Sequence, residues 1–431
     1  MKKRLLSVLL AGAMVCSLPM NVMAAEGAGE EEITLSLWTW SPITRTAEKM
    51  IEAFETEHPN IRIDFTYYNY NPEYLSALSA ASASDNMPDV MGLQPGSLTQ
   101  TYKDYLIDYS EYAEADWGEN WEDNFYSLSA EQITLGNAEG DESCKILPIE
   151  TQDIYIEYNK ALFEELGLSA PTTYDELVNC ANVLKENGIA PLYFGGADGW
   201  QHVNLFLMVV SQMDRELFDK CQNGEKSWNN ETILKAMENY KKLFDDGVIQ
   251  EGALSTTSYS AGTNLFLAGQ AGMMVLGSWW VQENTADDVT EAVENWDYDY
   301  FYLPGITEGC ETSAPIGGVD FGYGITTNCE HPEAAWEFIK SCAVGAGAEA
   351  IANDLNNHLS WKEVKVTDTS LNEKVVDEFN RSGEDLNDLM NQRIAEPTIE
   401  TAVQEALQGL AGDQYTPEEA AAHIQEAQDA L

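Results

Sequence analysis

The stretch from residue 145 to residue 171 limits most strongly what this chain can fold into, because its pattern changes several times over a short distance. After an apolar run that is interrupted at Pro148, apolar and polar side chains alternate through Ile154–Tyr158. A period of two predicts a half-buried strand. Asn159 can cap a short helix after that strand. We interpret residues 148–153 as an extended crossing where the chain leaves one lobe and enters a second.

Strands and helices also alternate near the beginning of the chain. Ile33–Trp38 is typical of a strand, Ala47–Glu57 of a helix with one apolar face, and Ile61–Phe65 of a second strand. Such a unit predicts parallel strands joined by a right-handed crossover. At 431 residues the chain is too long for one ordinary core. We therefore expect an α/β protein with two lobes.

The formal net charge is −51, from 22 basic and 73 acidic residues. This charge argues against nucleic acid and anionic membranes as ligands, because both would be repelled. It also disfavours an anionic small molecule, although a local basic pocket could override the average. The simplest interpretation of the acidity is a highly solvated surface that keeps the protein soluble outside the cell.

The first 25 residues have the pattern of a signal peptide. A basic start at Lys2–Arg4 precedes an apolar core at Leu5–Leu18, and Val22–Ala24 is similar to a cleavage site. The apolar core is too short to span a bilayer. Residues 26–32 are small and acidic, which predicts a flexible linker. We expect the mature protein to be exported and soluble.

Cysteines and histidines give no sign of a metal or cofactor. No C-x-x-C pair and no histidines at metal-ligand spacing occur in the sequence. Export permits disulfides, but buried free thiols are an equal alternative, and the connectivity stays open. The six cysteines beyond the signal segment are Cys144, Cys180, Cys221, Cys310, Cys329 and Cys342.

Several motifs together resemble one protein family. Leu147-Pro148, Tyr158-Asn159-Lys160 and the run Pro171–Leu177 are similar to the hinge and second-lobe entry of the extracellular solute-binding proteins. These proteins are the receptor subunits of sugar-type ABC importers and include the maltose-binding family. NLFLAGQAGMMVLGSWW at 264–280 and HPEAAWEFIK at 331–340 resemble further signatures of the family. The resemblance covers about residues 33–430.

The resemblance implies a two-lobed, periplasmic-binding-protein-like fold of type II. Each lobe would be a mainly parallel sheet flanked by helices, and hinge crossings would join the lobes. Lipid-anchored receptors of this family begin at a cysteine, so Cys16 raises an anchor as an alternative to free release. Its context, Ala13-Met14-Val15, departs from the usual lipobox. The expected parts of the N-terminal lobe are 33–150 and 301–345, and those of the C-terminal lobe are 151–300 and 346–431.

Tryptophans are expected at strand ends or turns, where they could contact a ligand. A sugar ring has flat C–H faces, and a rigid indole can cover one of them. The plain alternative is that each indole fills a core. Trp279 is the strongest candidate, because it follows a Gly-Ser step at a strand end and matches the family motif. The candidates are Trp38, Trp40, Trp200, Trp279 and Trp280.

Polar candidates are carried over from the family motifs. Gln152 stands where maltose-type receptors place an acidic contact, so the difference leaves the exact sugar open. Asp198 shares a turn with Trp200, and Gln94 falls near another contact. A lone histidine is more often structural than ligand-binding. The weaker candidates are His202, Asp320, Asn357 and His358.

Catalysis is not expected. Asp198 and Glu157 could form a carboxylate pair such as glycosidases need, but 73 acidic residues make chance pairs common. The sequence has no G-x-S-x-G, H-E-x-x-H or Walker motif. We expect a monomeric extracellular receptor that closes on a carbohydrate, in particular an oligosaccharide, and delivers it to an ABC permease. The alternative is a surface glycan adhesin or sensor without a transport role.

Overall fold

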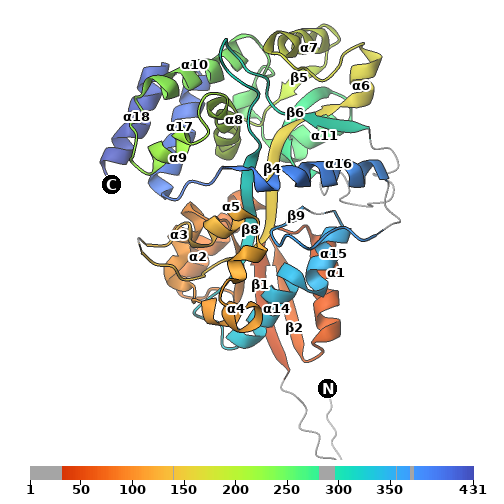
Figure 1. Ribbon diagram of the computed structural model, residues 1–431, viewed down its shortest axis with the longest axis vertical. Coiled ribbons are helices and arrows are strands. Elements are labelled where there is room, and N and C mark those ends of the chain that lie inside the picture. The colour runs from red at the N-terminus through yellow and green to blue at the C-terminus, as the bar shows by residue number, and fades with distance from the viewer. Residues whose placement is uncertain (1–31, 139, 281–296, 356, 369–372) are drawn as a thin grey trace, which may run out of the picture.

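Two lobes, one above the other in Figure 1, are joined by long strands that run between them. The N-terminal lobe lies below and the C-terminal lobe above, and helices flank the strands of each lobe. The structure is a computed structural model that describes residues 32–138, 140–280, 297–355, 357–368 and 373–431.

The N-terminal lobe begins with the strand–helix–strand unit expected from the sequence. Ile33 to Thr39 pairs in parallel with Ile61 to Tyr67, which confirms the predicted parallel pairing. The helices and strands that precede the first crossing are β1 (Ile33–Thr39), α1 (Thr44–Glu57), β2 (Ile61–Tyr67), η1 (Tyr70–Tyr74), α2 (Leu75–Ser84), β3 (Val90–Leu93), α3 (Ser97–Tyr102), η2 (Lys103–Tyr105), α4 (Ser110–Trp117), η3 (Trp121–Asn124), α5 (Ser127–Glu131) and η4 (Gln132–Thr134).

The C-terminal lobe is built from the middle and the end of the chain. The predicted cap is present, because the Asn159 side chain accepts from Leu162 N, and Thr173 and Glu176 form a capping box further along the chain. The elements are α6 (Lys160–Glu165), α7 (Tyr174–Glu186), β5 (Ala190–Tyr193), α8 (Gly199–Ser211), α9 (Leu217–Gln222), α10 (Glu231–Asp245), η5 (Ala253–Ser255), η6 (Ser258–Gly262), α11 (Thr263–Leu267), β6 (Ala271–Gly277), β7 (Tyr298–Phe301), α16 (Glu373–Glu384), η7 (Asp385–Asn387), α17 (Pro397–Ala411) and α18 (Pro417–Asp429).

Two long antiparallel strands, β4 (Leu147–Asn159) and β8 (Ile316–Ile325), run through both lobes. The strand order along the sheet is β2-β1-β3-β8-β4-β6-β5, so the two crossing strands lie at its centre. Two short strands also pair with them, β9 (His358–Leu359) with β4 and β10 (Met390–Asn391) with β8. The chain therefore crosses the hinge region on β4 and β8, and β9 and β10 lie beside them.

The hydrophobic side chains form two main cores, one in each lobe. On β4, Ile149 belongs to the N-terminal core and Ile154 to the C-terminal core. On β8, Ile316 belongs to the C-terminal core and Phe321 to the N-terminal core. The polar stretch of β4 between Ile149 and Ile154 thus lies between the cores.

The prediction of a half-buried strand at Ile154–Tyr158 is wrong in one respect. Both faces of β4 are buried, including Tyr155. The Tyr155 ring stacks on Tyr300 with 4.2 Å between centroids, and the Arg381 guanidinium lies over Tyr300 at 4.6 Å from its ring. The alternating pattern predicted that Tyr155 faces solvent, but a tyrosine ring also packs well against other aromatic rings.

The chain stays in the N-terminal lobe longer than we expected. The helices α14 (Pro332–Val344) and α15 (Ala346–Asn353) pack against α1. Ile351 and Trp361 both belong to the N-terminal core, so α15 and Trp361 do not lie in the C-terminal lobe, although Leu355 between them packs with Phe266 and Trp280. The return passage comes later, because α15 carries an apolar face that only the N-terminal core covers.

The predicted signal peptide, the linker up to residue 31 and Cys16 lie outside the described residues. Within the part of the chain that the structure describes, none of the helices has the length and apolar character needed to cross a bilayer.

Candidate ligand-binding site

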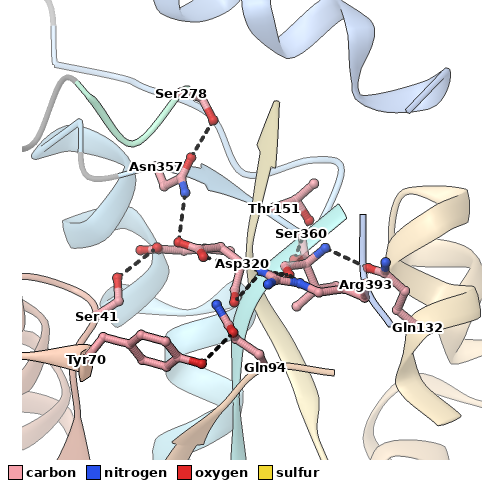
Figure 2. Close-up of polar contacts among 12 residues, drawn as sticks. Ser41, Tyr70, Gln94, Gln132, Thr151, Ser278, Asp320, Asn357, Ser360 and Arg393 are labelled. Atoms are coloured by element: carbon pink, nitrogen blue, oxygen red, sulfur yellow. Dashed lines mark hydrogen bonds and ion pairs between the residues drawn. The ribbon is translucent and has the colours of Figure 1, made fainter. Parts of the chain in front are cut away.

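Polar side chains from both lobes meet where β4 and β8 cross between them (Figure 2). Asp320 on β8 lies at the centre, and its side chain is 14% exposed. Asn357 Nδ2 donates to Asp320 Oδ2 at 3.4 Å, and the Gln94 side chain also hydrogen-bonds to this carboxylate. Burial raises the pKa of Asp320, while Arg393 and these two amides oppose the rise. The carboxylate is thus held by several donors that a ligand hydroxyl could replace.

Hydrogen bonds continue from Asp320 into each lobe. On the N-terminal side, Tyr70 Oη donates to Gln94 Oε1 at 2.9 Å. On the other side, Ser278 Oγ donates to Asn357 Oδ1 at 2.8 Å. Burial raises the pKa of Tyr70, so its hydroxyl stays a neutral donor. The chain Tyr70–Gln94–Asp320–Asn357–Ser278 thus connects the end of β3 with the end of β6.

Arg393 supplies a positive charge to this cluster from the segment that follows β10. Its Nε and Nη2 donate to Val319 O at 2.9 and 2.8 Å, and Nη2 also donates to Asp320 O at 3.0 Å. Nη2 lies 3.5 Å from Asp320 Oδ1. The planar guanidinium therefore fixes β8 at the crossing and partly compensates the buried carboxylate.

Next to Arg393, the two lobes touch directly through α3 and the start of α17. Ser97 N donates to Ile394 O at 2.9 Å, Gln100 Nε2 donates to Glu396 Oε2 at 2.9 Å, and Ser97 Oγ donates to Glu400. Burial raises the pKa of Glu400. We call the following residues the α3–α17 contact: Gly96, Ser97, Gln100, Arg393, Ile394, Glu396 and Glu400.

Aromatic rings lie on both sides of the polar cluster. In the N-terminal lobe, the half-buried Trp40 packs 4.9 Å from Tyr70 and 5.9 Å from Phe321, measured between ring centroids. In the C-terminal lobe, Trp200 at the start of α8 lies 6.3 Å from Trp279 and 6.0 Å from Tyr259. Trp200 is half-buried and Tyr259 is exposed, so this pair offers ring surface to a ligand.

The predicted tryptophans are placed very differently. Trp40 and Trp200 flank the cluster, and Trp38 packs against Tyr68 on the same side as Trp40. Trp279 is only 4% exposed and contacts Trp200 by its edge. Trp280 is fully buried between Phe266 and Tyr298, where its indole fills a small core. The Trp280 side chain is therefore closed to a ligand in this structure.

The predicted polar residues also divide into two groups. Gln94, Asp320 and Asn357 meet in the cluster. Asp198 precedes α8, accepts from Ser258 N at 2.8 Å and has a pKa that burial raises. Gln152 lies in β4 with only 6% of its surface exposed.

Both histidine candidates are tied into cores. His202 Nε2 lies 2.8 Å from Gly196 O and Nδ1 hydrogen-bonds to Tyr240, and burial lowers its pKa to about 4. His358 bonds to Ser382 and stacks on Phe379 with 4.0 Å between rings, and burial lowers its pKa to about 3. Both rings are buried, and protein partners occupy both ring nitrogens of His202 and Nε2 of His358, so we expect neither histidine to bind a ligand.

Sequence reasoning missed Tyr70, Ser278, Arg393 and Glu400. The segment containing Arg393 carried one usable signal: a basic residue just before a helix that begins with Pro397. Its partners on β8 are more than 70 residues earlier, and no local pattern joins them. Among the described residues, no group of three or more acidic, cysteine or histidine side chains could hold a metal ion.

The model of the bacterial extracellular solute-binding protein family matches residues 40–343. The chain belongs to this family. The solute-binding protein is 24% identical to the multiple sugar-binding protein of Streptococcus mutans, over 74% of this chain and 73% of that protein.

Solved structures show the same fold. A chitin oligosaccharide binding protein aligns with a TM-score of 0.76 at 25% identity, covering 93% of this chain and 98% of the other. Maltose-bound MalE3 of T. maritima aligns with a TM-score of 0.74 at 19% identity, covering 93% and 100%. The predicted two-lobed periplasmic-binding-protein-like fold is therefore confirmed.

Proposed function

We propose that this solute-binding protein captures a carbohydrate, in particular an oligosaccharide, between its lobes and delivers it to an ABC permease. The observation that carries this proposal is the Asp320 cluster, where donors and acceptors from both lobes converge on one carboxylate beside exposed ring surface. The related proteins include a multiple sugar-binding protein, a chitin oligosaccharide binding protein and a maltose-bound receptor.

The chemistry of the cluster suits a polyhydroxylated ring. A sugar hydroxyl both donates and accepts, so one hydroxyl can bond to the Asp320 carboxylate and another can accept from Asn357 or Gln94. The Trp200 and Trp40 rings can cover the C–H faces of the sugar residues. We include Trp38, Asp198, Gln152 and Trp279 as neighbours of this site, and leave out Trp280 and His358 because their side chains are occupied in cores.

Ligand capture would act by lobe closure. A ligand that touches both lobes favours the closed form over the open one by its difference in affinity for the two. The permease would then recognise the surface that the two lobes form together in the closed state. We propose a monomer that is exported through the signal peptide at residues 1–25, acts outside the cell and carries out no catalysis.

The test is a thermal-shift screen of neutral oligosaccharides, followed by calorimetric titration of each hit. A ligand at one hundred times its Kd stabilises a folded protein by about 2.7 kcal/mol, which raises the thermal midpoint by several degrees. The expected result is a rise with one class of glycan and no product after incubation. Failure of every neutral glycan, or its cleavage, would contradict the proposal.

A further inference from the structure

Three passages of the chain meet at the hydroxyl group of Tyr302. Tyr302 follows β7 on the way to the second crossing, Asp153 lies in β4 at the first crossing, and Asp385 begins η7 in the return passage. Tyr302 Oη lies 2.5 Å from Asp153 Oδ2 and 2.8 Å from Asp385 Oδ2. We call these three residues the hinge clasp.

Counting hydrogens shows that this arrangement lacks one proton if both carboxyl groups are ionised. A phenol has one hydrogen, so it can donate to only one of the two carboxylates. The other contact would then bring two oxygen lone pairs to hydrogen-bond distance, which is repulsive. Both contacts become hydrogen bonds when one of the two carboxyl groups is protonated and donates to Tyr302 Oη.

Burial identifies Asp153 as the protonated carboxyl group. Its side chain is 0% exposed, and Oδ1 makes no well-formed hydrogen bond with the described residues, although the backbone amides of Ile154 and Ile316 favour the charged form. A buried carboxylate with an unsatisfied oxygen is strongly disfavoured, so the neutral acid is the stable form. Asp385 is half-exposed, and water can solvate its charge. Burial, more than any other cause, holds the pKa of Asp153 well above its usual range.

The charged groups around the clasp do not compensate a second negative charge there. Asp385 raises the pKa of Asp153 further. Arg381 on α16 lies over the Tyr300 ring and pairs with Asp299. Tyr300 interacts with both carboxyl groups of the clasp and with Arg381. Arg381 is therefore already engaged by another carboxylate.

The clasp is joined to the candidate ligand-binding site by consecutive hydrogen bonds. Asp153 N donates to Ser278 Oγ at 3.1 Å, and Ser278 N donates to Asp153 O at 2.9 Å. Ser278 Oγ in turn donates to Asn357, which donates to Asp320. A shift of β4 at Asp153 would thus move a partner of the central carboxylate.

We propose that Asp153 holds a proton at neutral pH and donates it to Tyr302, so that the hinge clasp stays closed and ligand binding is linked to this proton. Each hydrogen then has one acceptor: Asp153 Oδ2–H donates to Tyr302 Oη, and the Tyr302 hydroxyl donates to Asp385 Oδ2. Release of the proton to water leaves two carboxylates around one phenol and loosens the first crossing. The link to ligand rests on the proposed function, whereas the proton itself does not.

Infrared difference spectroscopy of the ligand-free protein at pH 7 tests the proton directly. The spectrum of the native protein minus that of Asp153→Asn should contain the carbonyl band of one protonated carboxylic acid, and Asp385→Asn should keep that band. Absence of this band from the difference spectrum would overturn the proposal. If Asp153→Asn does not fold, Tyr302→Phe must shift the band, and an unchanged band would also overturn it.

Calorimetric titration of a bound glycan from pH 6 to pH 10 tests the linkage. Affinity of the native protein should fall as the proton is released, by up to about tenfold per pH unit. The affinity of Asp153→Asn should not change over this pH range, because its amide donates to Tyr302 at every pH. An identical pH profile in both proteins would refute the linkage. Loss of all glycan binding would instead refute the proposed function, and the infrared band would still decide the proton.

Discussion

Arg393 Nη2 lies 3.0 Å from the main-chain oxygen of Asp320 and 3.5 Å from its carboxylate, although the two residues belong to different passages of the chain. Both side chains are 14% exposed. An ion pair with this little solvent is sensitive to loss of one partner, because the other charge stays behind without compensation. The pair therefore links ligand recognition to the stability of the crossing.

Replacing Asp320 by Asn should weaken both properties. The amide keeps the size of the side chain but leaves the Arg393 charge unpaired, so we expect a loss of about 1–3 kcal/mol in the free energy of unfolding. Glycan affinity should fall at least tenfold. Urea denaturation and calorimetric titration measure the two effects. Asp388→Asn is the matched control, because its pair with Arg215 is exposed and should contribute less than about 1 kcal/mol. Equal effects in both variants would contradict a special role for Asp320.

Trp200→Ala should reduce glycan affinity without unfolding the protein. The ring is half-buried at the start of α8, and removing it exposes a sugar face to water, which we expect to lower affinity about 10- to 100-fold. Calorimetric titration gives the number. Trp117→Phe is the control, since Trp117 packs on Trp336 and Trp361 in the N-terminal core, with ring centroids 5.2 and 4.8 Å away. That variant should lose stability and keep affinity; the reverse pattern would place the ligand elsewhere.

Gly96→Ala should open the α3–α17 contact. A Cβ at Gly96 would lie 2.5 Å from Ile394 O, and the backbone has φ of +91°. Gly118 has a similar φ of +88°, but a Cβ there would meet nothing within 4 Å. Gly118→Ala therefore measures the backbone strain alone, about 1–2 kcal/mol. Gly96→Ala should lose more stability and increase the radius of gyration in small-angle scattering. Identical behaviour of the two variants would show that the lobes do not depend on this contact.

Acid should destabilise the protein through His202. Its pKa is lowered from 6.5 to about 4 by burial, so between these values the unfolded chain binds a proton that the folded protein does not. Stability therefore falls as pH drops from 6.5 towards 4, by about 3 kcal/mol in total. Urea denaturation across this range should show a shallower fall in His202→Gln. A native profile in His202→Gln would refute the assignment.

Local patterns predicted most elements of the fold. The Asn159 cap and the parallel pairing of β1 with β2 follow from nearby residues, and both are present. The burial of both faces of β4 did not follow, because the covering residues Tyr300 and Arg381 come from distant segments.

The candidate site could be predicted only in part. Gln94, Asp320 and Trp200 were accessible because family motifs or strand ends mark their positions. Arg393 and Glu400 were not, since nothing in their local sequence shows that the return passage brings them to β8 and α3. Trp280 shares its motif with Trp279, yet the direction of each ring depends on packing with Phe266 and Trp200.

The most direct test of the account is a crystal structure with a glycan identified by the screen. We expect the glycan between the lobes, with a hydroxyl bonded to the Asp320 carboxylate and a sugar face against Trp200. A glycan bound outside the space between the lobes, with the Asp320–Asn357–Ser278 hydrogen bonds unchanged, would contradict it.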